Sequence, residues 1–225
     1  MAPLLRAAHK YHDKVPEKRS DAPTIMELRS VSFRYAATGR FALNECNLEL
    51  KLGDRWLLEG ASGSGKSTLA NLVAGIYTPS SGLVLLNGLD RVTLGATEWR
   101  NRVASAPQFH ENHLMSAPLS FNLLMGRSWP PSPADLQDAR ELCTALGLGA
   151  LLKRMPSGIN QIIGETGWQL SQGERSRVFL ARAVLQKAAV VVLDESFGAL
   201  DPCTLQQCMK VVRARVPTLV VVAYP

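Results

Sequence analysis

The sequence predicts an α/β fold in which a helical lobe interrupts a core of strands and helices. Three observations support this prediction. Strand-like patterns predominate between about residues 25 and 86, helical spacing dominates the middle, and strands alternate with helices towards the end. This order of elements is typical of an α/β core with an insertion. The 225 residues, 46% of them hydrophobic and 20% charged, can form a core without a disulfide or a metal.

The first part of the chain predicts several strands and one helix. Residues 1–22 are polar and are interpreted as a linker or N-terminal arm. Alternation or short apolar runs predict strands at residues 25–35, 41–50, 55–59 and 83–86. Leu69, Leu72 and Val73 lie at helical spacing, so we expect a helix over residues 67–75.

The middle of the chain contains a helix with clear start and stop signals. Ser132 can cap this helix, Pro133 suits its first position, and Asp135 favours its positive end. Gly147 is expected to end it. Further along, we expect a long helix over residues 171–187 and buried strands over 188–193 and 218–222.

Charge and cysteine content exclude some function classes. The net charge is +6, but no polybasic block occurs, so a nucleic-acid partner is not expected. No apolar run approaches the ~20 residues that span a bilayer. The four cysteines form no CxxC pair, which favours a reducing compartment over a disulfide framework.

A glycine-rich segment between an expected strand and the first expected helix carries the clearest functional signal. Residues 60–67 read GASGSGKS and match the pattern GxxxxGK[ST]. The glycines let backbone N–H groups turn towards a polyphosphate, and the helix N-terminus adds a positive partial charge. In this pattern Lys66 reaches the β- and γ-phosphates, and the Ser67 hydroxyl coordinates Mg²⁺. The segment therefore predicts a nucleotide-binding site.

A second element of such a site is expected where the strand over residues 188–193 ends. That strand runs into Asp194, and Glu195 follows directly. A carboxylate at the end of a buried strand can hold the magnesium shell, and we assign this role to Asp194. Glu195 would then polarise an attacking water. Such a pair is by itself also compatible with solvated carboxylates, but beside the phosphate motif it indicates an NTPase.

Further motifs make the chain resemble the ATP-binding cassette (ABC) domain, the ATPase module of ABC transporters. Residues 170–174 (LSQGE) resemble the LSGGQ-type signature of that family, and Glu174 precedes Asp194 by 20 residues. The other motifs follow the family's order: Tyr35 at the end of VSFRY, Gln108 after SAP, and residues 198–201 (GALD) after Glu195. The resemblance covers about residues 24–225 and includes stretches similar to those of exporter-type cassettes.

The resemblance implies roles for these residues. Tyr35 resembles the aromatic residue that stacks on adenine, Gln108 the glutamine that contacts Mg²⁺ or water, and Asp201 a residue that crosses a dimer interface. The signature is expected to meet the ATP held by a second subunit. The implied ATP-binding residues are Tyr35, Gly60, Ser62, Gly63, Ser64, Gly65, Lys66, Ser67 and Thr68. The implied signature residues are Leu170, Ser171, Gln172, Gly173 and Glu174, and the implied metal ligands are Ser67, Gln108 and Asp194.

The resemblance also implies an architecture and partners. It implies a P-loop NTPase core with an N-terminal antiparallel β-subdomain and an inserted α-helical signature subdomain at about residues 109–187. The ABC domain would occupy residues 23–225 and lack the family's C-terminal end. The implied ligands are ATP and Mg²⁺. The implied partners are the transmembrane domain of an exporter and a second nucleotide-binding domain in a homo- or heterodimer. The domain would then lie on the cytoplasmic side of a membrane.

Some of these residues also have purely structural interpretations. Ser171 and Glu174 fit an S-x-x-E capping box, which is compatible with a nucleotide contact. Arg175, Arg177 and Arg182 are expected to form a solvated or interface face of the signature helix.

The clearest departure from the family pattern is Tyr224, which stands where a switch histidine is usual. A tyrosine hydroxyl can donate a hydrogen bond, but it cannot supply an imidazolium charge. We therefore expect Tyr224 to lie at the catalytic site, and we expect the chain to hydrolyse ATP slowly. Two alternatives remain at this point: a regulatory cassette with impaired hydrolysis, and a non-transport ABC ATPase that acts on nucleic acid.

Overall fold

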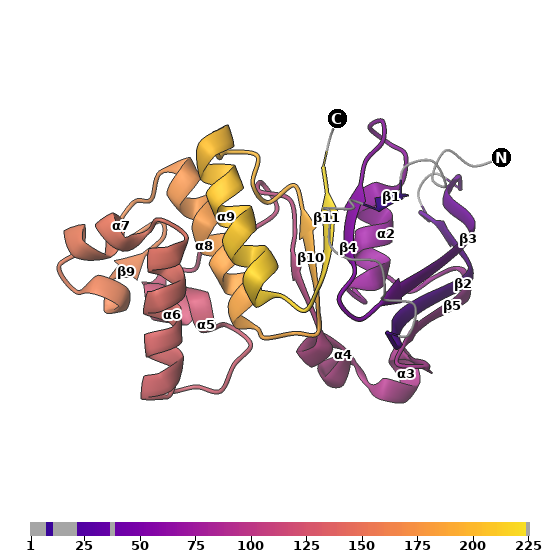
Figure 1. The fold of residues 1–225 in the computed structure, drawn as a ribbon, viewed down its shortest axis with the longest axis horizontal. Coiled ribbons are helices and arrows are strands. Elements are labelled where there is room, and N and C mark those ends of the chain that lie inside the picture. The colour runs from indigo at the N-terminus through magenta and orange to yellow at the C-terminus, as the bar shows by residue number, and fades with distance from the viewer. Residues whose placement is uncertain (1–7, 11–21, 37–38, 224–225) are drawn as a thin grey trace. The chain divides into compact units, whose positions relative to one another are not determined.

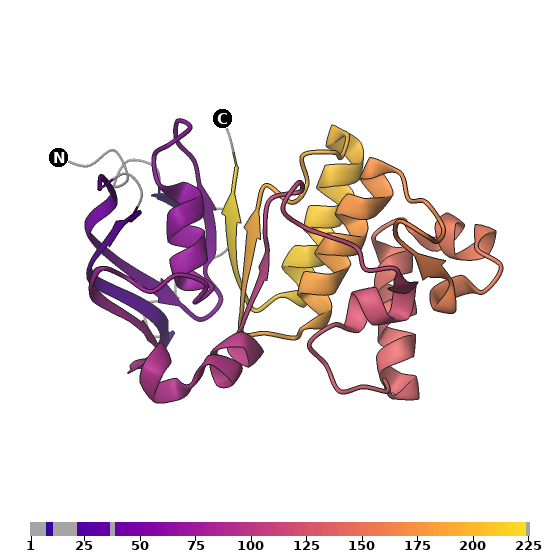
Figure 2. The same cartoon turned by 180° about the vertical axis from the view of Figure 1, so that it is seen from behind.

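The computed structural model describes residues 8–10, 22–36 and 39–223. The contacts of the chain divide it into two compact units. The first unit contains the described residues up to Ser105, Ala188–Asp194, and those from Pro217 onward. The second unit contains Ala106–Lys187 and Glu195–Val216. Figures 1 and 2 show the ribbon from two opposite sides.

The first unit contains two sheets. The larger one has the strand order β1 (Ala8–Lys10), β4 (Arg55–Leu58), β11 (Thr218–Val222), β10 (Val190–Asp194) and β7 (Val103–Ala106). β4, β11 and β10 are parallel to one another, and β1 pairs antiparallel with β4. The second sheet is antiparallel, in the order β3 (Phe41–Lys51), β2 (Thr24–Arg34), β5 (Ser81–Leu86) and β6 (Leu89–Asp90). A core with mixed α/β sheets is thereby confirmed.

The segment expected to be a linker, residues 1–22, contributes one short strand. Its residues 8–10 form β1. That part of the segment therefore extends a sheet, while most of the remainder lies outside the described residues.

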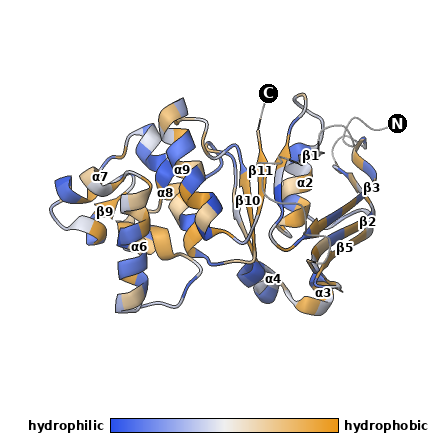
Figure 3. Cartoon of the chain, in the orientation of Figure 1, coloured by the Kyte–Doolittle hydropathy of each residue, from blue (hydrophilic) through white to orange (hydrophobic). Residues whose placement is uncertain are grey.

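Apolar residues from both sheets pack around the helix α2 (Lys66–Val73) of the first unit. α2 contacts both β10 and β11, and its side chains Leu69 and Leu72 are almost fully buried. β10 and β11 are buried along their whole length, as expected for short β-branched runs between covering layers. Their hydrophobic character is visible in Figure 3. This core holds the ends of β4 and β10 in place for the site described below.

Two short helices, α3 (Arg91–Leu94) and α4 (Ala96–Arg102), follow β6. α4 buries Trp99, whose ring nitrogen donates to the Val73 carbonyl 3.2 Å away. A Cβ at Gly75 would lie 2.7 Å from two ring atoms of Trp99, and Gly75 has a φ of 71°. Glycine is therefore required here for both its conformation and its lack of a side chain.

Replacing Gly75 by Ala should lower the free energy of unfolding more than the same change at Gly88. Gly88 has a similar φ of 79°, but a Cβ there would meet no atom within 4 Å. Gly88→Ala should cost roughly 1–2 kcal/mol through backbone strain alone. Gly75→Ala should cost a further 1–3 kcal/mol, as is usual when a packed core must shift. Urea unfolding measures the free energy of unfolding of both variants. If the two variants lose the same free energy, the Trp99 side chain moves aside without cost.

The second unit is mainly helical. Its helices are α5 (Leu119–Leu124), α6 (Pro133–Ala145), α7 (Gly149–Arg154), η1 (Gly158–Asn160), α8 (Gln172–Leu185) and α9 (Pro202–Arg215). A small two-stranded sheet joins β8 (Ala117–Pro118) to β9 (Ile162–Ile163). α8 contacts α5, α6 and α9, and its residues Val178, Phe179 and Leu180 are fully buried. α8 is therefore the central helix of this unit.

The start and stop signals expected for the helix after Ser132 are confirmed. The Ser132 hydroxyl accepts from the backbone N–H of Asp135, and Pro133 occupies the first helical position. Gly147 follows the helix with a φ of 77°, a conformation that favours glycine. Among the described residues, no helix is both long enough and apolar enough to cross a lipid bilayer.

Candidate functional site

The glycine-rich segment lies where the sequence predicted it, between β4 and α2. Gly63 and Gly65 adopt positive φ angles of 77° and 92°, which turns the loop back upon itself. A Cβ on Gly65 would lie 2.6 Å from the Ala42 carbonyl, so the loop also passes too close to β3 for a side chain. α2 then begins at Lys66 without an acidic residue in its first turn. The positive end of this helix is therefore compatible with an anion.

Two side chains of this loop have the properties that a polyphosphate site requires. Lys66 is 5% exposed, and its ammonium donates to the carbonyls of Gly60 at 2.7 Å and Ala61 at 3.1 Å. The hydroxyl of Ser64 is buried and has no hydrogen-bond partner among the described residues. A buried cation and an unpartnered donor on one loop fit an anion with several oxygens. Ser62 is exposed on the same loop, and Thr68 is buried in α2.

The structure brings Tyr35 to the helix that follows this loop. The Tyr35 hydroxyl lies 2.9 Å from the Thr68 hydroxyl. Its ring meets the rings of Phe33 and Tyr77 edge to face. With 40% of Tyr35 exposed, the side chain keeps an accessible surface while its position is restrained. A restrained, half-exposed aromatic ring beside a phosphate loop is suited to stacking on a base.

Sheet register places Asp194 at the same edge as the phosphate loop. Val222 of β11 is the register partner of both Leu58 at the end of β4 and Asp194 at the end of β10. Because neighbouring strands lie about 4.8 Å apart, Asp194 is roughly 10 Å across the sheet from the point where the loop begins. Asp194 is 4% exposed. Its carboxylate and the Ser67 hydroxyl are hard oxygen donors of the kind that Mg²⁺ prefers.

The second unit contains Glu195 and Gln108. Glu195 has a φ of 48°, a left-handed conformation that is uncommon for glutamate and often found at functional positions. The next residue, Ser196, is fully buried, and its hydroxyl donates to the carbonyls of Ala106 at 2.8 Å and Pro107 at 3.1 Å. Ser196 therefore ties the backbone beside Glu195 to the backbone just before Gln108.

The signature residues form the start of α8. The predicted capping box is confirmed: the Ser171 hydroxyl accepts from the Glu174 N–H, and the Glu174 carboxylate accepts from the Ser171 N–H. Gly173 lies beside the loop after Glu195, because a Cβ placed on it would be 3.6 Å from the Ala199 carbonyl oxygen. The signature and residues 198–201 are thus neighbours within the second unit. Leu170 is half-buried and Gln172 is exposed.

Asp201 caps a helix. Its carboxylate accepts from the backbone N–H groups of Cys203 and Thr204 at 3.1 and 3.0 Å, at the start of α9. The hydrogen bonds from Thr204 and Cys203 hold the pKa of Asp201 below its ordinary value. This capping role was not expected from the sequence, and the dimer-interface role of Asp201 stays a prediction.

A family model matches a stretch of the chain that contains most of these motifs. Residues 43–198, which include the phosphate loop, the signature and Asp194, match the family described as ABC transporter. The chain belongs to the ABC transporter family.

Individual ABC transporters resemble the chain over most of its length. The ATP-dependent lipid A-core flippase of Yersinia pestis bv. Antiqua (strain Antiqua) is 36% identical over 176 residues, which cover 78% of this chain and 29% of the flippase. The alpha-hemolysin translocation ATP-binding protein HlyB of Escherichia coli O157:H7 is 31% identical over 224 residues, covering 89% of this chain and 31% of HlyB. The chain thus spans less than a third of the length of these curated relatives.

A solved structure shares the fold of this ABC transporter chain. A bacterial Atm1-family ABC exporter with ATP bound matches it with a TM-score of 0.78 and 28% sequence identity. The match covers 96% of this chain and 38% of that chain. The P-loop NTPase fold of the ABC transporter family is therefore the fold of this chain.

For one of the three arginines on the signature helix, the expected solvated position is wrong. Arg182 does not belong to a solvated face: it donates to the backbone carbonyls of Asn122 and His113 and to the side-chain oxygens of Asn112 and Asn122. Burial lowers the pKa of Arg182 to about 10. The pattern of charges along α8 could not reveal this, because Asn112 lies 70 residues away in the sequence.

Tyr224 of this ABC transporter chain lies outside the described residues. The strand that precedes it, β11, runs between β4 and β10, and the N–H of Ala223 donates to the Leu58 carbonyl at 3.1 Å. The catalytic role of Tyr224 stays a prediction.

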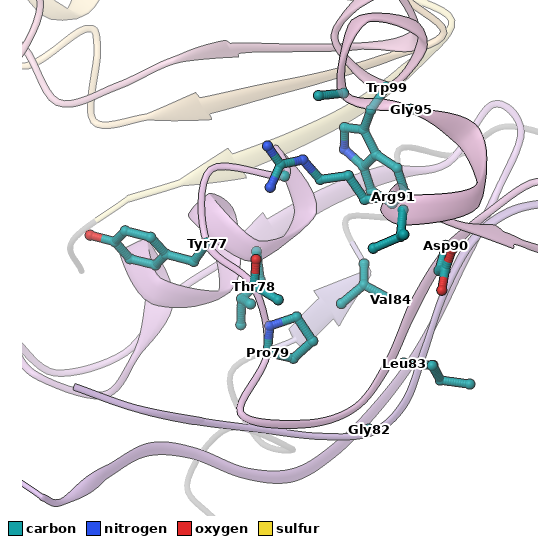
Figure 4. A pocket seen from close by; sticks show the side chains of 14 residues that line it. Tyr77, Thr78, Pro79, Gly82, Leu83, Val84, Asp90, Arg91, Gly95 and Trp99 are labelled. Atoms are coloured by element: carbon teal, nitrogen blue, oxygen red, sulfur yellow. The ribbon is translucent and has the colours of Figure 1, made fainter. Parts of the chain in front are cut away.

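A pocket of about 440 Å³ lies in the first unit, away from the phosphate loop. Figure 4 shows its lining, which includes Trp99, Arg91, Leu83, Val84 and Pro79. None of the expected ATP-binding residues lines it. Because its walls are largely apolar and lack the glycine-rich backbone amides that bind polyphosphates, it is not the triphosphate site.

Proposed function

We propose that this chain is the ATP-binding and ATP-hydrolysing domain of an ABC exporter, which drives transport across a membrane by nucleotide-dependent dimerisation. The observation that carries the proposal is the phosphate loop: Lys66 is buried at the start of α2, and the Ser64 hydroxyl just before it has no hydrogen-bond partner in the part of the chain that the structure describes. The name of the solved relative supplies the exporter class, and the curated relatives are named as a flippase and a translocation protein. A nucleic-acid role is not favoured, because none of these three names refers to nucleic acid.

In this proposal the first unit binds the nucleotide. Tyr35 stacks on the adenine, and residues 60–68 bind the phosphates through backbone N–H groups, Lys66 and side-chain hydroxyls. Ser67, Asp194 and Gln108 would hold Mg²⁺, which supplies positive charge to the phosphate oxygens. Lys66 exchanges its bonds to the loop carbonyls for bonds to phosphate oxygens. Its buried charge is thus available without a large rearrangement.

Glu195 acts on water in this proposal. Its carboxylate accepts a proton as the water oxygen attacks the γ-phosphorus, and ADP leaves. The left-handed backbone of Glu195 and the bonds of Ser196 to Ala106 and Pro107 support a fixed position for its side chain. The signature of a second domain contacts the same nucleotide, so that two nucleotides lie between two domains. Asp201 lies at that dimer interface.

Co-purification tests the exporter assignment. The protein is isolated from membranes with and without ATP, and phosphate release is measured on the recovered complex. We expect the chain to be recovered with an integral membrane partner and to release phosphate. Tight ATP binding without phosphate release in the complex would favour the regulatory alternative. Recovery with nucleic acid, in a salt-dependent way, would favour the non-transport alternative.

The Tyr224→His variant tests the slow turnover that we propose for this chain. A histidine can carry a positive charge near the γ-phosphate at neutral pH, and a tyrosine cannot. We expect Tyr224→His to release phosphate several-fold faster than the unmodified chain, with unchanged ATP affinity. Tyr224→Phe is the control and should give no gain. Equal turnover of the unmodified chain and Tyr224→His would show that position 224 does not limit the rate.

A further inference from the structure

The signature of this chain carries an acidic side chain, Glu174, at the N-terminal end of α8. Glu174 stands in the first turn of the helix, and its side chain is 13% exposed. One of its carboxylate oxygens accepts from the Ser171 N–H at 2.8 Å. A glutamine would make the same capping bond without a charge. The first turn therefore combines N–H groups that attract anions with a carboxylate that repels them.

A cation from a different helix contacts this carboxylate. Arg154, the last residue of α7, lies with its Nη2 2.5 Å from the other carboxylate oxygen of Glu174. Arg154 is 60% exposed at its side chain, whereas Glu174 is almost covered. The carboxylate is thus bonded on both oxygens, and its charge is balanced at the surface.

Arg177 interacts differently with the same turn. Its guanidinium donates to the carbonyls of Gly173 at 3.0 Å and Gly147 at 2.8 Å. These bonds fix the backbone of the signature, but they do not involve the Glu174 carboxylate. Arg154 therefore balances the charge of this turn, and Arg177 holds its backbone.

We propose that Arg154 is a positioning residue of the signature, which holds and neutralises Glu174 so that the first turn of α8 can accept the polyphosphate of a nucleotide bound by a second copy of the chain. This inference rests on the proposed function, in which the signature contacts the ATP of another domain. Arg154 acts through Glu174 and need not touch the nucleotide. An exposed ion pair adds little to folding stability, so its main effect would fall on anion binding.

The expected consequence is electrostatic and depends on salt. Without Arg154, the carboxylate of Glu174 would face the incoming phosphates uncompensated, at a distance within the Debye length of ~10 Å in 0.1 M salt. The loss should shrink at high ionic strength, because mobile ions then screen the carboxylate. A purely structural role for Arg154 would not show this dependence.

The test is a double-mutant cycle on nucleotide-driven association. Self-association is titrated with adenylyl imidodiphosphate and Mg²⁺ by light scattering, at low and high salt. Arg154→Ala should need roughly three- to tenfold more nucleotide than the unmodified chain at low salt. Arg154→Lys should restore most of the loss. Lys153→Ala, which removes the neighbouring exposed cation on α7, should change the midpoint less than the Arg154 variant.

The Glu174→Gln background decides whether Arg154 acts through Glu174. In that background, Arg154→Ala should shift the midpoint by less than about twofold, because no carboxylate remains to be neutralised. An undiminished loss in that background would overturn the inference, as would a loss that is independent of salt. If the unmodified chain binds the nucleotide but does not associate, the proposed use of the signature on a second copy is wrong, and this inference falls with it. Melting curves of each variant establish that it is folded.

Discussion

Replacing Glu195 by Gln should lower the rate of ATP hydrolysis by roughly 100- to 10,000-fold, the usual contribution of a general base. Glutamine has nearly the same shape and keeps hydrogen-bonding atoms, but it cannot accept a proton from water. The turn that carries Glu195 should be unaffected, because Ser196 still bonds to Ala106 and Pro107. Phosphate release and ATP affinity are both measured. The rate should fall while the affinity is retained or increased.

The control for this experiment is Glu165→Gln, which alters an exposed glutamate of the second unit outside the expected catalytic residues. Its rate should equal that of the unmodified chain. If Glu195→Gln keeps more than about a tenth of the original rate, then Glu195 is not the base. If Glu195→Gln loses ATP binding as well, the residue contributes to the structure of the site and its role as a base is not supported.

Replacing Lys66 by Ala should weaken ATP binding by roughly 10- to 100-fold, since each hydrogen bond to a charged group contributes about 1.5–3 kcal/mol. The buried ammonium of Lys66 is the charge on the phosphate loop that can meet the phosphates. Without nucleotide, the variant leaves the carbonyls of Gly60 and Ala61 without their contacts to Lys66. The effect on binding should therefore exceed the effect on the stability of the free chain.

Thermal unfolding with and without ATP measures the stability of the free chain and its stabilisation by bound ATP in one experiment. A ligand at 100 times its dissociation constant stabilises the folded state by about 2.7 kcal/mol. We expect this stabilisation for the unmodified chain and for Lys153→Ala, whose exposed lysine lies on α7. Lys66→Ala should lose most of it at the same ATP concentration. An unchanged stabilisation in Lys66→Ala would show that the triphosphate is not bound at this loop.

Local patterns predicted the elements that build the phosphate site. The second half of β3 alternates between exposed and more buried residues, and β10 and β11 are short, fully buried β-branched runs, so the hydrophobic pattern predicted these strands. The burial of β2 is less regular, because its pairing shifts register, although its strand was also predicted. The capping box at Ser171 and the helix start at Ser132 were recognisable because capping depends on residues three positions apart. The glycine-rich loop was recognised from its spacing alone.

The contacts that join distant segments could not be predicted in this way. Arg154 meets Glu174 from a helix 20 residues earlier, and Ser196 meets Ala106 from 90 residues away. Nothing in the local sequence distinguishes these side chains from solvated ones. The strand β7 was also missed, because its four residues, VASA, include two alanines and a serine and show little hydrophobic pattern.

The position of β11 has a consequence for how the chain is made. This strand lies between β4 and β10 in the sheet, yet it follows both of them in the sequence. During synthesis, β4 and β10 therefore emerge from the ribosome before the strand that must separate them exists. The pairings of β4 and β10 with β11 cannot form until residues 218–222 have been added, and such long-range pairing slows folding. We infer that the edge of β4 that pairs with β11 stays unpaired for most of the synthesis, when chaperones and aggregation compete for it.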